Sequence, residues 1–465
     1  MTAYRTPGVF VQQEYASLFP ITQADTAIPA FLGYTRIAQK QVANDLLLKP
    51  VKISSLAQFV HYFGSPEKST IHVTDNGAGG YSIRPAAKPE ENYLLYYSVA
   101  MFFGNGGRAC SIISVGTNGL PSPEQIKQLT ALNDLQAGLN KLAKEGEPTL
   151  IVIPEAVLLP PNHFQILARE VLKQCGTLRD RFAIFDLYDG GLEPDGISLR
   201  ANRDYFGEDH LRFGAAYYPF LKAPLELLKG PGKVDAGIRI SIEGSRPVGI
   251  ATVQKKYPDM YQAVKNKLQE CFVILPPSGA IAGVYSTVDH NRGVWKAPAN
   301  ESLRNGLCPA VAVDSGQQDL FHVDPVAGKS INVIREFPGR GTVVWGARTL
   351  AGNDNEWRYV SVRRFYSMVE ESITRSTRWV VFEPNDANTW VKVHSAIENF
   401  LTTLWRQGAL AGAKPDEAFF VRCGLGSTMT PQDILEGRMI MEIGLAVSRP
   451  GEFVILRIAH KMQEA

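Results

Sequence analysis

Three aspartates lie where an α/β protein could hold a metal ion. Asp186 and Asp189 belong to the apolar run RFAIFDLYDG at 181–190, which is typical of a buried strand, and Asp195 follows it. Such folds bind ligands at the carboxyl ends of their strands, and carboxylate oxygens are the ligands that Ca²⁺ and Mg²⁺ prefer. Loop carboxylates more often cap turns in contact with solvent. We therefore interpret the three as structural and expect no metal site.

Two other patterns could support catalysis but lack the spacing it needs. The glycine-rich stretch FFGNGGRAC at 102–110 follows an expected helix rather than a strand, and it has neither G-x-G-x-x-G nor Walker spacing. We interpret it as the glycine turn that ends a helix. Asp289, His290 and Ser427 could make a nominal Ser/His/Asp set, but no G-x-S-x-G elbow or other nucleophile signature accompanies them. The sequence thus predicts no catalytic residues.

Composition restricts the function classes further. The chain has 465 residues, of which 45% are hydrophobic and 20% charged, and its formal net charge is +2. This balance suits a globular chain of roughly two to four domains and favours neither a nucleic-acid partner nor insertion into a membrane. The histidines form no H-x-x-x-H or H-x-H pair, the five cysteines form no C-x-x-C pair, and no secretory signal is visible. We expect a cytoplasmic protein without metal, cofactor or disulfide framework.

The apolar periodicity predicts a mixed α/β fold with several domains. Strand-like and helix-like runs alternate between residues 90 and 190, which favours a parallel sheet covered by helices. A loop or flap is expected at 65–90 and a helix within 359–379. A second helix, at 388–408, carries Trp390, Val393, Ile397, Phe400, Leu401 and Leu404 on one apolar stripe.

The expected organisation has three parts. An N-terminal arm and linker occupies 1–26, and an α/β middle region occupies 27–355, with an irregular β-rich insertion near 190–270. A C-terminal domain at 356–465 combines helices and a β-sheet with a terminal strand.

Both ends of the chain have the pattern of isolated strands. Near the N-terminus these residues are Gly8, Val9, Phe10, Val11 and Gln12, after Pro7; near the C-terminus they are Phe453, Val454, Ile455, Leu456, Arg457 and Ile458, after Pro450. Proline fits the start of a strand better than its middle, and a lone strand has to pair its backbone groups with some partner. On the residues alone, pairing within the same domain is favoured over pairing with another molecule.

Five longer stretches resemble a known family. They are YRTPGVFVQQ at the start, FVILPPSGAIAGVYSTVDHNRGVWKAPAN at 272–300, NVIREFPGRGTVVWGARTL at 332–350, RYVSVRRFYSMVEESITRSTRWVVFEPNDANTWVKVHSAIENFLTTLWRQGALAG at 358–412, and GRMIMEIGLAVSRPGEFVILRIAHK at 437–461. In this order they are similar to the tail sheath proteins of contractile phage tails and of phage-tail-like contractile injection systems. Only the segments at 65–90 and around 190–260 lack clear similarity to the family.

The resemblance implies a structural subunit rather than an enzyme. Subunits of this family form stacked hexameric rings around an inner tube, and their contraction drives the tube through a target cell envelope. The implied partners are further copies of the chain, the inner tube protein, baseplate and tail terminator or cap proteins, and paralogous sheath subunits. The implied site of assembly is the bacterial cytoplasm.

The resemblance also changes the interpretation of the two ends. In the family, terminal arms add strands to sheets of neighbouring subunits, which is β-augmentation. We therefore expect the strand residues named above to be inter-subunit arms. The C-terminal domain would face the tube through charged side chains, for which Lys392, Arg406 and Lys414 are candidates. The alternative function is an oligomeric α/β hydrolase-like enzyme with strand arms.

Overall fold

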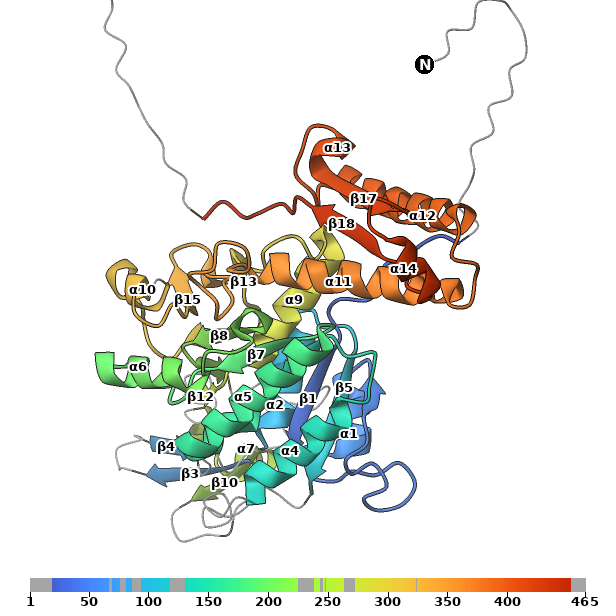
Figure 1. Cartoon of the computed structure of the whole chain (residues 1–465). Coiled ribbons are helices and arrows are strands. Elements are labelled where there is room, and N and C mark those ends of the chain that lie inside the picture. Colours follow the sequence, from blue (N-terminus) through green and yellow to red (C-terminus); the bar gives the residue numbers. More distant parts are fainter. Residues whose placement is uncertain are drawn as a thin grey trace, which may run out of the picture. The chain divides into compact units, whose positions relative to one another are not determined.

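The computed structural model describes residues 19–66, 69–75, 81–85, 93–117, 130–224, 238–242, 246, 248–262, 272–322 and 324–452 (Figure 1). These residues group into two compact units. The sheet unit contains residues 25–368 and 449–452, and the hairpin unit contains residues 19–24 and 369–448. The contacts thus divide the chain inside helix α11 (Val360–Ser376), whereas the sequence favoured a boundary at the loop before it.

A nine-stranded sheet is the largest one among the described residues. Its order is β13 (Glu301–Ser302), β16 (Gly341–Val344), β15 (Ile331–Phe337), β8 (Gly214–Tyr218), β7 (Phe182–Asp186), β6 (Leu150–Val152), β1 (Pro29–Tyr34), β5 (Cys110–Gly116) and β2 (Val51–Ile53). The strands from β15 to β5 are parallel, and β13, β16 and β2 pair in the antiparallel sense. Taken in chain order, β1, β5, β6, β7 and β8 show the 2-1-3-4-5 arrangement of doubly wound folds.

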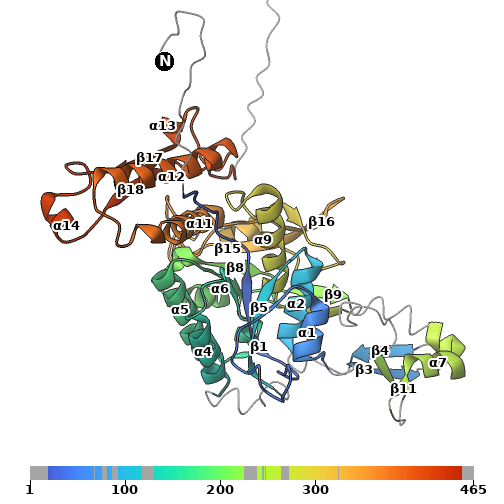
Figure 2. The same ribbon diagram turned by 90° about the vertical axis from the view of Figure 1, so that its right-hand side faces the viewer.

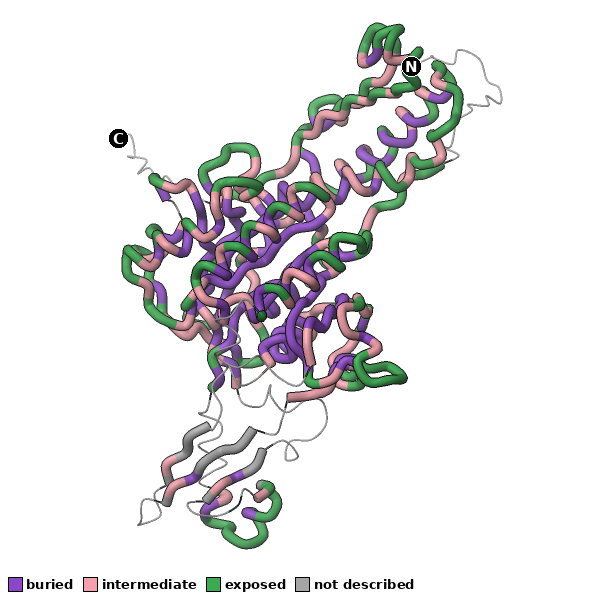
Figure 3. The backbone as a smooth tube through the Cα atoms, turned by 60° about the horizontal axis from the view of Figure 1, so that its bottom comes forward, coloured by how far each residue is buried: buried purple, intermediate pink, exposed green. Residues whose placement is uncertain are grey.

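Helices cover both faces of this sheet. One face packs against α1 (Leu56–Phe63), α2 (Leu94–Gly104) and α9 (Ser278–Arg292); the other packs against α4 (Thr130–Leu142), α5 (Pro161–Leu178), α6 (Gly196–Tyr205) and α10 (Ser315–His322). Along β1, Phe31 belongs to the first core, while Ala30 and Leu32 belong to the second. Burial on both faces explains why these strands are continuous apolar runs, and Figure 3 shows the buried residues concentrated there. The predicted helix-covered parallel sheet is confirmed.

Two smaller sheets complete the sheet unit. One has the order β11 (Val248–Gly249), β10 (Ile238–Ile242), β3 (Ser69–Asp75) and β4 (Tyr81–Pro85), with α7 (Ile250–Lys256) following β11 (Figure 2). The other has the order β12 (Phe272–Leu275), β9 (Leu221–Pro224) and β14 (Cys308–Pro309). The prediction of a loop at 65–90 is therefore wrong where β3 and β4 form. Their sequences, STIHVTD and YSIRP, are polar, and β3 finds its parallel partner, β10, far away in the sequence.

The hairpin unit is built on two helices and a two-stranded sheet. After α11 come η5 (Arg378–Val380), α12 (Ala387–Arg406), α13 (Pro415–Ala418), β17 (Phe419–Cys423), α14 (Pro431–Leu435) and β18 (Met441–Leu445). Asp386 caps α12 by accepting a hydrogen bond from the backbone of Thr389. The predicted apolar stripe of α12 is buried, except that Trp390 is half-buried. Among the described helices of the chain, none is long and apolar enough to cross a membrane.

Candidate functional site: the roots of two terminal arms

Two of the three aspartates that could have held a metal ion, Asp186 and Asp195, instead cap helices. Asp186 accepts hydrogen bonds from the backbone nitrogen and the hydroxyl of Ser278, at 2.7 and 2.5 Å, where α9 begins. Burial raises the pKa of Asp186 to about 7, against the lowering effect of these two bonds. Asp195 caps α6 through the backbone nitrogen of Ser198. Within the described ranges, no three His, Cys, Asp or Glu side chains are grouped to hold a metal ion.

A buried carboxyl that the sequence did not reveal occupies the crossover point of the sheet. Glu155 follows β6, and its Oε1 accepts a hydrogen bond from the backbone nitrogen of Leu95 at the start of α2, at 2.9 Å. A Cβ atom on Gly33, at the end of β1, would lie 2.1 Å from Oε2 of Glu155. Burial raises the pKa of Glu155 to about 8. Doubly wound enzymes bind their ligands between such strand ends; here a side chain fills the position and caps a helix.

The nominal Ser/His/Asp set has no catalytic geometry. Asp289 forms a buried two-pronged ion pair with Arg364, with nitrogen–oxygen distances of 3.0 and 2.5 Å. His290 is exposed on α9, and Ser427 belongs to a turn of the hairpin unit. A carboxylate that is bound to an arginine in this way is not available to orient a histidine as a general base.

The chain that enters from the N-terminal arm is tied down along α11 and β1. In the hairpin unit, the ring of Phe19 stacks on Trp379 with centroids 4.3 Å apart. The backbone nitrogens of Thr22 and Ala24 donate to the hydroxyls of Ser376 and Ser372, at 3.1 and 2.8 Å. Since α11 presents serine hydroxyls at this spacing, an extended segment can lie along the helix with its backbone groups satisfied. We call residues 19–28 the N-terminal root.

The second half of the N-terminal root is bound within the sheet unit. The carbonyl of Thr26 accepts hydrogen bonds from Arg364 and from the hydroxyl of Thr149, at 3.1 and 2.5 Å. The same hydroxyl accepts from the backbone nitrogen of Ile28, immediately before β1. Because Arg364 also pairs with Asp289, the root is attached to a buried, charge-compensated group rather than to the surface.

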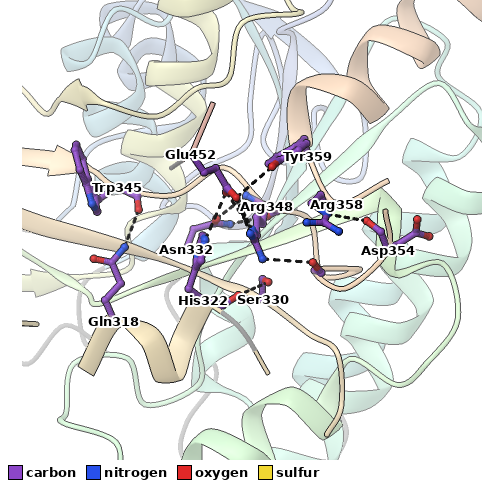
Figure 4. A network of polar contacts seen from close by, with 11 residues as sticks. Gln318, His322, Ser330, Asn332, Trp345, Arg348, Asp354, Arg358, Tyr359 and Glu452 are labelled. Carbon is purple, nitrogen blue, oxygen red and sulfur yellow. Dashed lines mark hydrogen bonds and ion pairs between the residues drawn. The ribbon is translucent and has the colours of Figure 1, made fainter. Parts of the chain in front are cut away.

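The chain that leaves toward the C-terminal arm is held by Glu452 (Figure 4). Arg348 donates to Glu452 from Nε at 3.0 Å and from a terminal guanidinium nitrogen at 2.6 Å. The hydroxyl of Tyr359 donates at 3.2 Å, and Nε2 of His322 lies 3.5 Å from the carboxylate. Residues 449–452 form the C-terminal root, and Glu452 immediately precedes the expected arm strand.

The electrostatics of this root favour the charged carboxylate. Burial alone would raise the pKa of Glu452, but hydrogen bonds from His322 and Arg348 and the positive charge of Arg348 lower it to about 2. Burial and the nearby carboxylate raise the pKa of the Tyr359 hydroxyl, which therefore stays a hydrogen-bond donor. A fully ionised Glu452 accepts several donors at once, which fixes the direction of the root.

A second layer of hydrogen bonds holds Arg348 in position. The backbone nitrogen of Arg348 donates to Oδ1 of Asn332 at 2.7 Å, and the side-chain amide of Asn332 donates back to the Arg348 carbonyl at 2.8 Å. The hydroxyl of Ser330 donates to the His322 carbonyl at 2.6 Å. Asn332 and Ser330 come from β15 and the residue before it, so the root is attached to the antiparallel side of the large sheet.

The hairpin unit has the features of a strand acceptor. β17 and β18 pair only with each other among the described strands, so each has one edge without a strand partner. α12 packs against β17, and the opposite surface exposes Phe420, Arg422 and Glu442. Two strands alone form a marginal sheet, and an unpaired edge is a template for a further strand.

The residues predicted from the sequence lie in three situations. Gly8 to Gln12 and Phe453 to Ile458, the expected arm strands, lie outside the described residues. Lys392 and Arg406 are exposed on α12, and Lys414 is exposed before α13. The root residues Glu452, Arg348 and Arg364 escaped the sequence interpretation. The only signal for them was the position of Glu452 directly before a strand-like run.

Comparison with known proteins gives a consistent result. A family model described as the phage tail sheath C-terminal domain matches residues 352–461. The tail sheath protein of Vibrio phage KVP40 is 28% identical over 138 residues, which are 29% of this chain and 20% of that protein. The chain thus matches about a fifth of the length of this relative.

Solved structures match over nearly the whole chain. A chain in the cryo-EM structure of the anti-feeding prophage baseplate is 30% identical, with a TM-score of 0.61, and the match covers 99% of this chain and 100% of that one. A chain of the anti-feeding prophage helical sheath in its contracted state is 29% identical, with a TM-score of 0.62 and the same coverage.

Proposed function

Because this chain belongs to the tail sheath proteins of contractile phage tails and phage-tail-like injection systems, we propose that it polymerises as stacked hexameric rings around an inner tube. It is a structural subunit and not an enzyme, as its relatives are. Contraction of the rings would drive the tube through a target envelope. The particle would assemble in the bacterial cytoplasm on a baseplate and end at a terminator or cap protein, with paralogous sheath subunits as further partners.

The subunits would be joined by strand exchange. In this proposal, Gly8–Gln12 and Phe453–Ile458 each add a strand to the β17–β18 hairpin of a neighbouring copy. Two observations together support this proposal. Glu452, immediately before one arm, is bound by Arg348, and the β17–β18 hairpin has open strand edges that could receive an arm. Main-chain hydrogen bonds at about 1 kcal/mol net each would join the copies and would persist while the rings move.

Three further assignments complete the proposal. The regions 1–26, 27–355 and 356–465 act as arm and linker, outer body, and inner C-terminal domain. Lys392, Arg406 and Lys414 are exposed, and they would face the inner tube. The linker around Gln13 to Phe19, which leads into the N-terminal root, would transmit the motion of one ring to the next.

Truncation of the arm tests the proposal. A chain without residues 1–15 should remain folded by circular dichroism and sediment as a monomer, whereas the full chain should form striated tubes in negative-stain micrographs. Val454→Lys should block assembly, because it places a charge on a face that the shared sheet buries. Lys461→Glu, near the chain end, is the matched control. Tubes formed by the truncated chain or by Val454→Lys would contradict strand exchange.

A further inference from the structure

A pocket of about 430 Å³ opens beside the C-terminal root. Five small or apolar residues, Ala297, Ala299, Trp345, Ala347 and Pro450, make up what we call its apolar rim. Most of its other walls are polar or charged, with Lys296, Asp319, Arg335 and Glu452 among them. Figure 4 shows Trp345 and Glu452 on the same side of α10. We call this cavity the root pocket.

Part of the apolar rim of the root pocket is not covered by any other residue in the described part of the chain. Trp345 is 36% exposed although its ring packs against Phe337 with centroids 4.7 Å apart. An indole in this position offers a large flat surface, and partly exposed tryptophans of this kind are the side chains that most often anchor protein interfaces. The rim is therefore suited to apolar side chains of another molecule.

The length of chain between the root and the arm decides which molecule that is. Glu452 is held by Arg348 at 2.6 Å, and in the proposed strand exchange the arm strand would begin at the next residue in the sequence. A residue spans at most about 3.5 Å, and paired strands lie about 4.8 Å apart. A hairpin unit that pairs with the arm consequently has to lie within a few ångströms of the root pocket. The occupant is then a second copy of this chain.

One end of the hairpin unit matches the apolar rim. The connection between β17 and β18 exposes Leu425, Leu435 and Ile440, which are 54%, 82% and 41% exposed. At the opposite end of the hairpin, the exposed residues before β17 are small or charged, with Ala411 and Ala413 beside Lys414, Asp416 and Glu417, and no large apolar side chain is among them. Because burial of apolar surface is favourable, the end with Leu425, Leu435 and Ile440 fits the apolar rim better than the other end does.

We propose that the root pocket is the seat for the 424–440 connection of a second copy, whose leucine and isoleucine side chains cover Trp345. This inference rests on the proposed strand exchange and adds a surface to it. It also sets the direction of the arm. An arm that starts beside the 424–440 connection runs toward the other end of the hairpin, parallel to β18 or antiparallel to β17.

Crosslinking in assembled sheaths tests the seat directly. Trp345 is replaced by the photoreactive residue p-benzoylphenylalanine, and the sheaths are assembled from a mixture of ¹⁵N-labelled and unlabelled subunits. Irradiation should join the two kinds of subunit, with the crosslink in a peptide from 424–440. Crosslinks only to other segments, only within one isotopic kind, or none at all would overturn the proposal.

Substitutions test whether the seat matters for assembly. Ala299→Trp, which fills the pocket, and Leu435→Asp, on the inserted end, should each lower the yield of tubes at least tenfold without changing the melting temperature. Ile197→Asp is the control, because Ile197 is 81% exposed and does not line the pocket. If Val454→Lys blocks assembly while Ala299→Trp assembles normally, strand exchange stands and the seat fails. If Val454→Lys itself assembles normally, both fail.

Discussion

Arg348 and Glu452 form a two-pronged ion pair at the last described residue before the C-terminal arm. Arg348 is 4% exposed, and its guanidinium approaches the carboxylate from Nε at 3.0 Å and from a terminal nitrogen at 2.6 Å. A pair of this geometry fixes both position and direction. The arm consequently leaves the sheet unit from a defined point.

Replacing Arg348 by Ala should release the C-terminal root while the rest of the sheet unit stays folded. Removal of one partner from a mostly buried pair costs about 3 kcal/mol, so cleavage of the chain after Glu452 by the glutamate-specific protease Glu-C should accelerate by roughly 100-fold. Limited proteolysis read by mass spectrometry measures this change. Lys52→Ala is the matched control, since Lys52 pairs with Glu147 on the surface. Equal rates of cleavage after Glu452 in both variants would show that the pair does not hold the root.

Acid should loosen the same root. The pKa of Glu452 lies near 2 in the folded chain, below its ordinary value of 4.5. A lowered carboxyl pKa contributes stability above the unfolded value, and this contribution disappears as the pH falls from about 4.5 toward 2. The shift corresponds to about 3 kcal/mol. The free energy of unfolding of the full chain, measured by urea titration, should therefore fall by up to this amount between pH 4.5 and 2. The fall should be smaller in Glu452→Gln, and an identical fall in the variant would assign it to another group.

Gly33 and Glu155 should be energetically coupled. Gly33→Ala places a Cβ atom where Oε2 of Glu155 lies, so the carboxyl has to leave its position at the start of α2. We expect the free energy of unfolding to fall by about 3 kcal/mol, as for other overpacked core sites. In a Glu155→Ala background the same change should cost at least 1 kcal/mol less. Urea unfolding of the four chains measures the coupling, and additive costs would exclude it.

Replacing Phe382 by glycine should stabilise the protein. Its φ is +74°, which costs a non-glycine residue about 1–2 kcal/mol, and its side chain is fully exposed. Glycine has a greater chain entropy in the unfolded state, which offsets about 0.5–1 kcal/mol of this gain. Phe382→Gly should therefore raise the free energy of unfolding by about 0.5–1 kcal/mol. Val381→Gly is the control, because Val381 has φ −64° and should lose stability. A loss in both variants would contradict the backbone argument.

Elements whose physics is local could be predicted from the sequence. β7, α5 and α12 were expected, because an apolar run or stripe records burial at period 2 or 3.6. The family followed from long stretches in a fixed order, and the comparisons confirm it.

Long-range pairing was decided only by the tertiary structure. β3 is polar and becomes a strand because β10, far along the chain, pairs with it in parallel. Glu452 and Arg348 are 104 residues apart, so no spacing rule connects them. Nothing in the sequence around Glu155 distinguishes it from other glutamates. It becomes a buried helix cap only because the fold brings β1, β6 and α2 together around it. Sequence periodicity records which side of an element is buried, whereas charge pairing depends on which distant groups the folded chain brings within about 3 Å of one another.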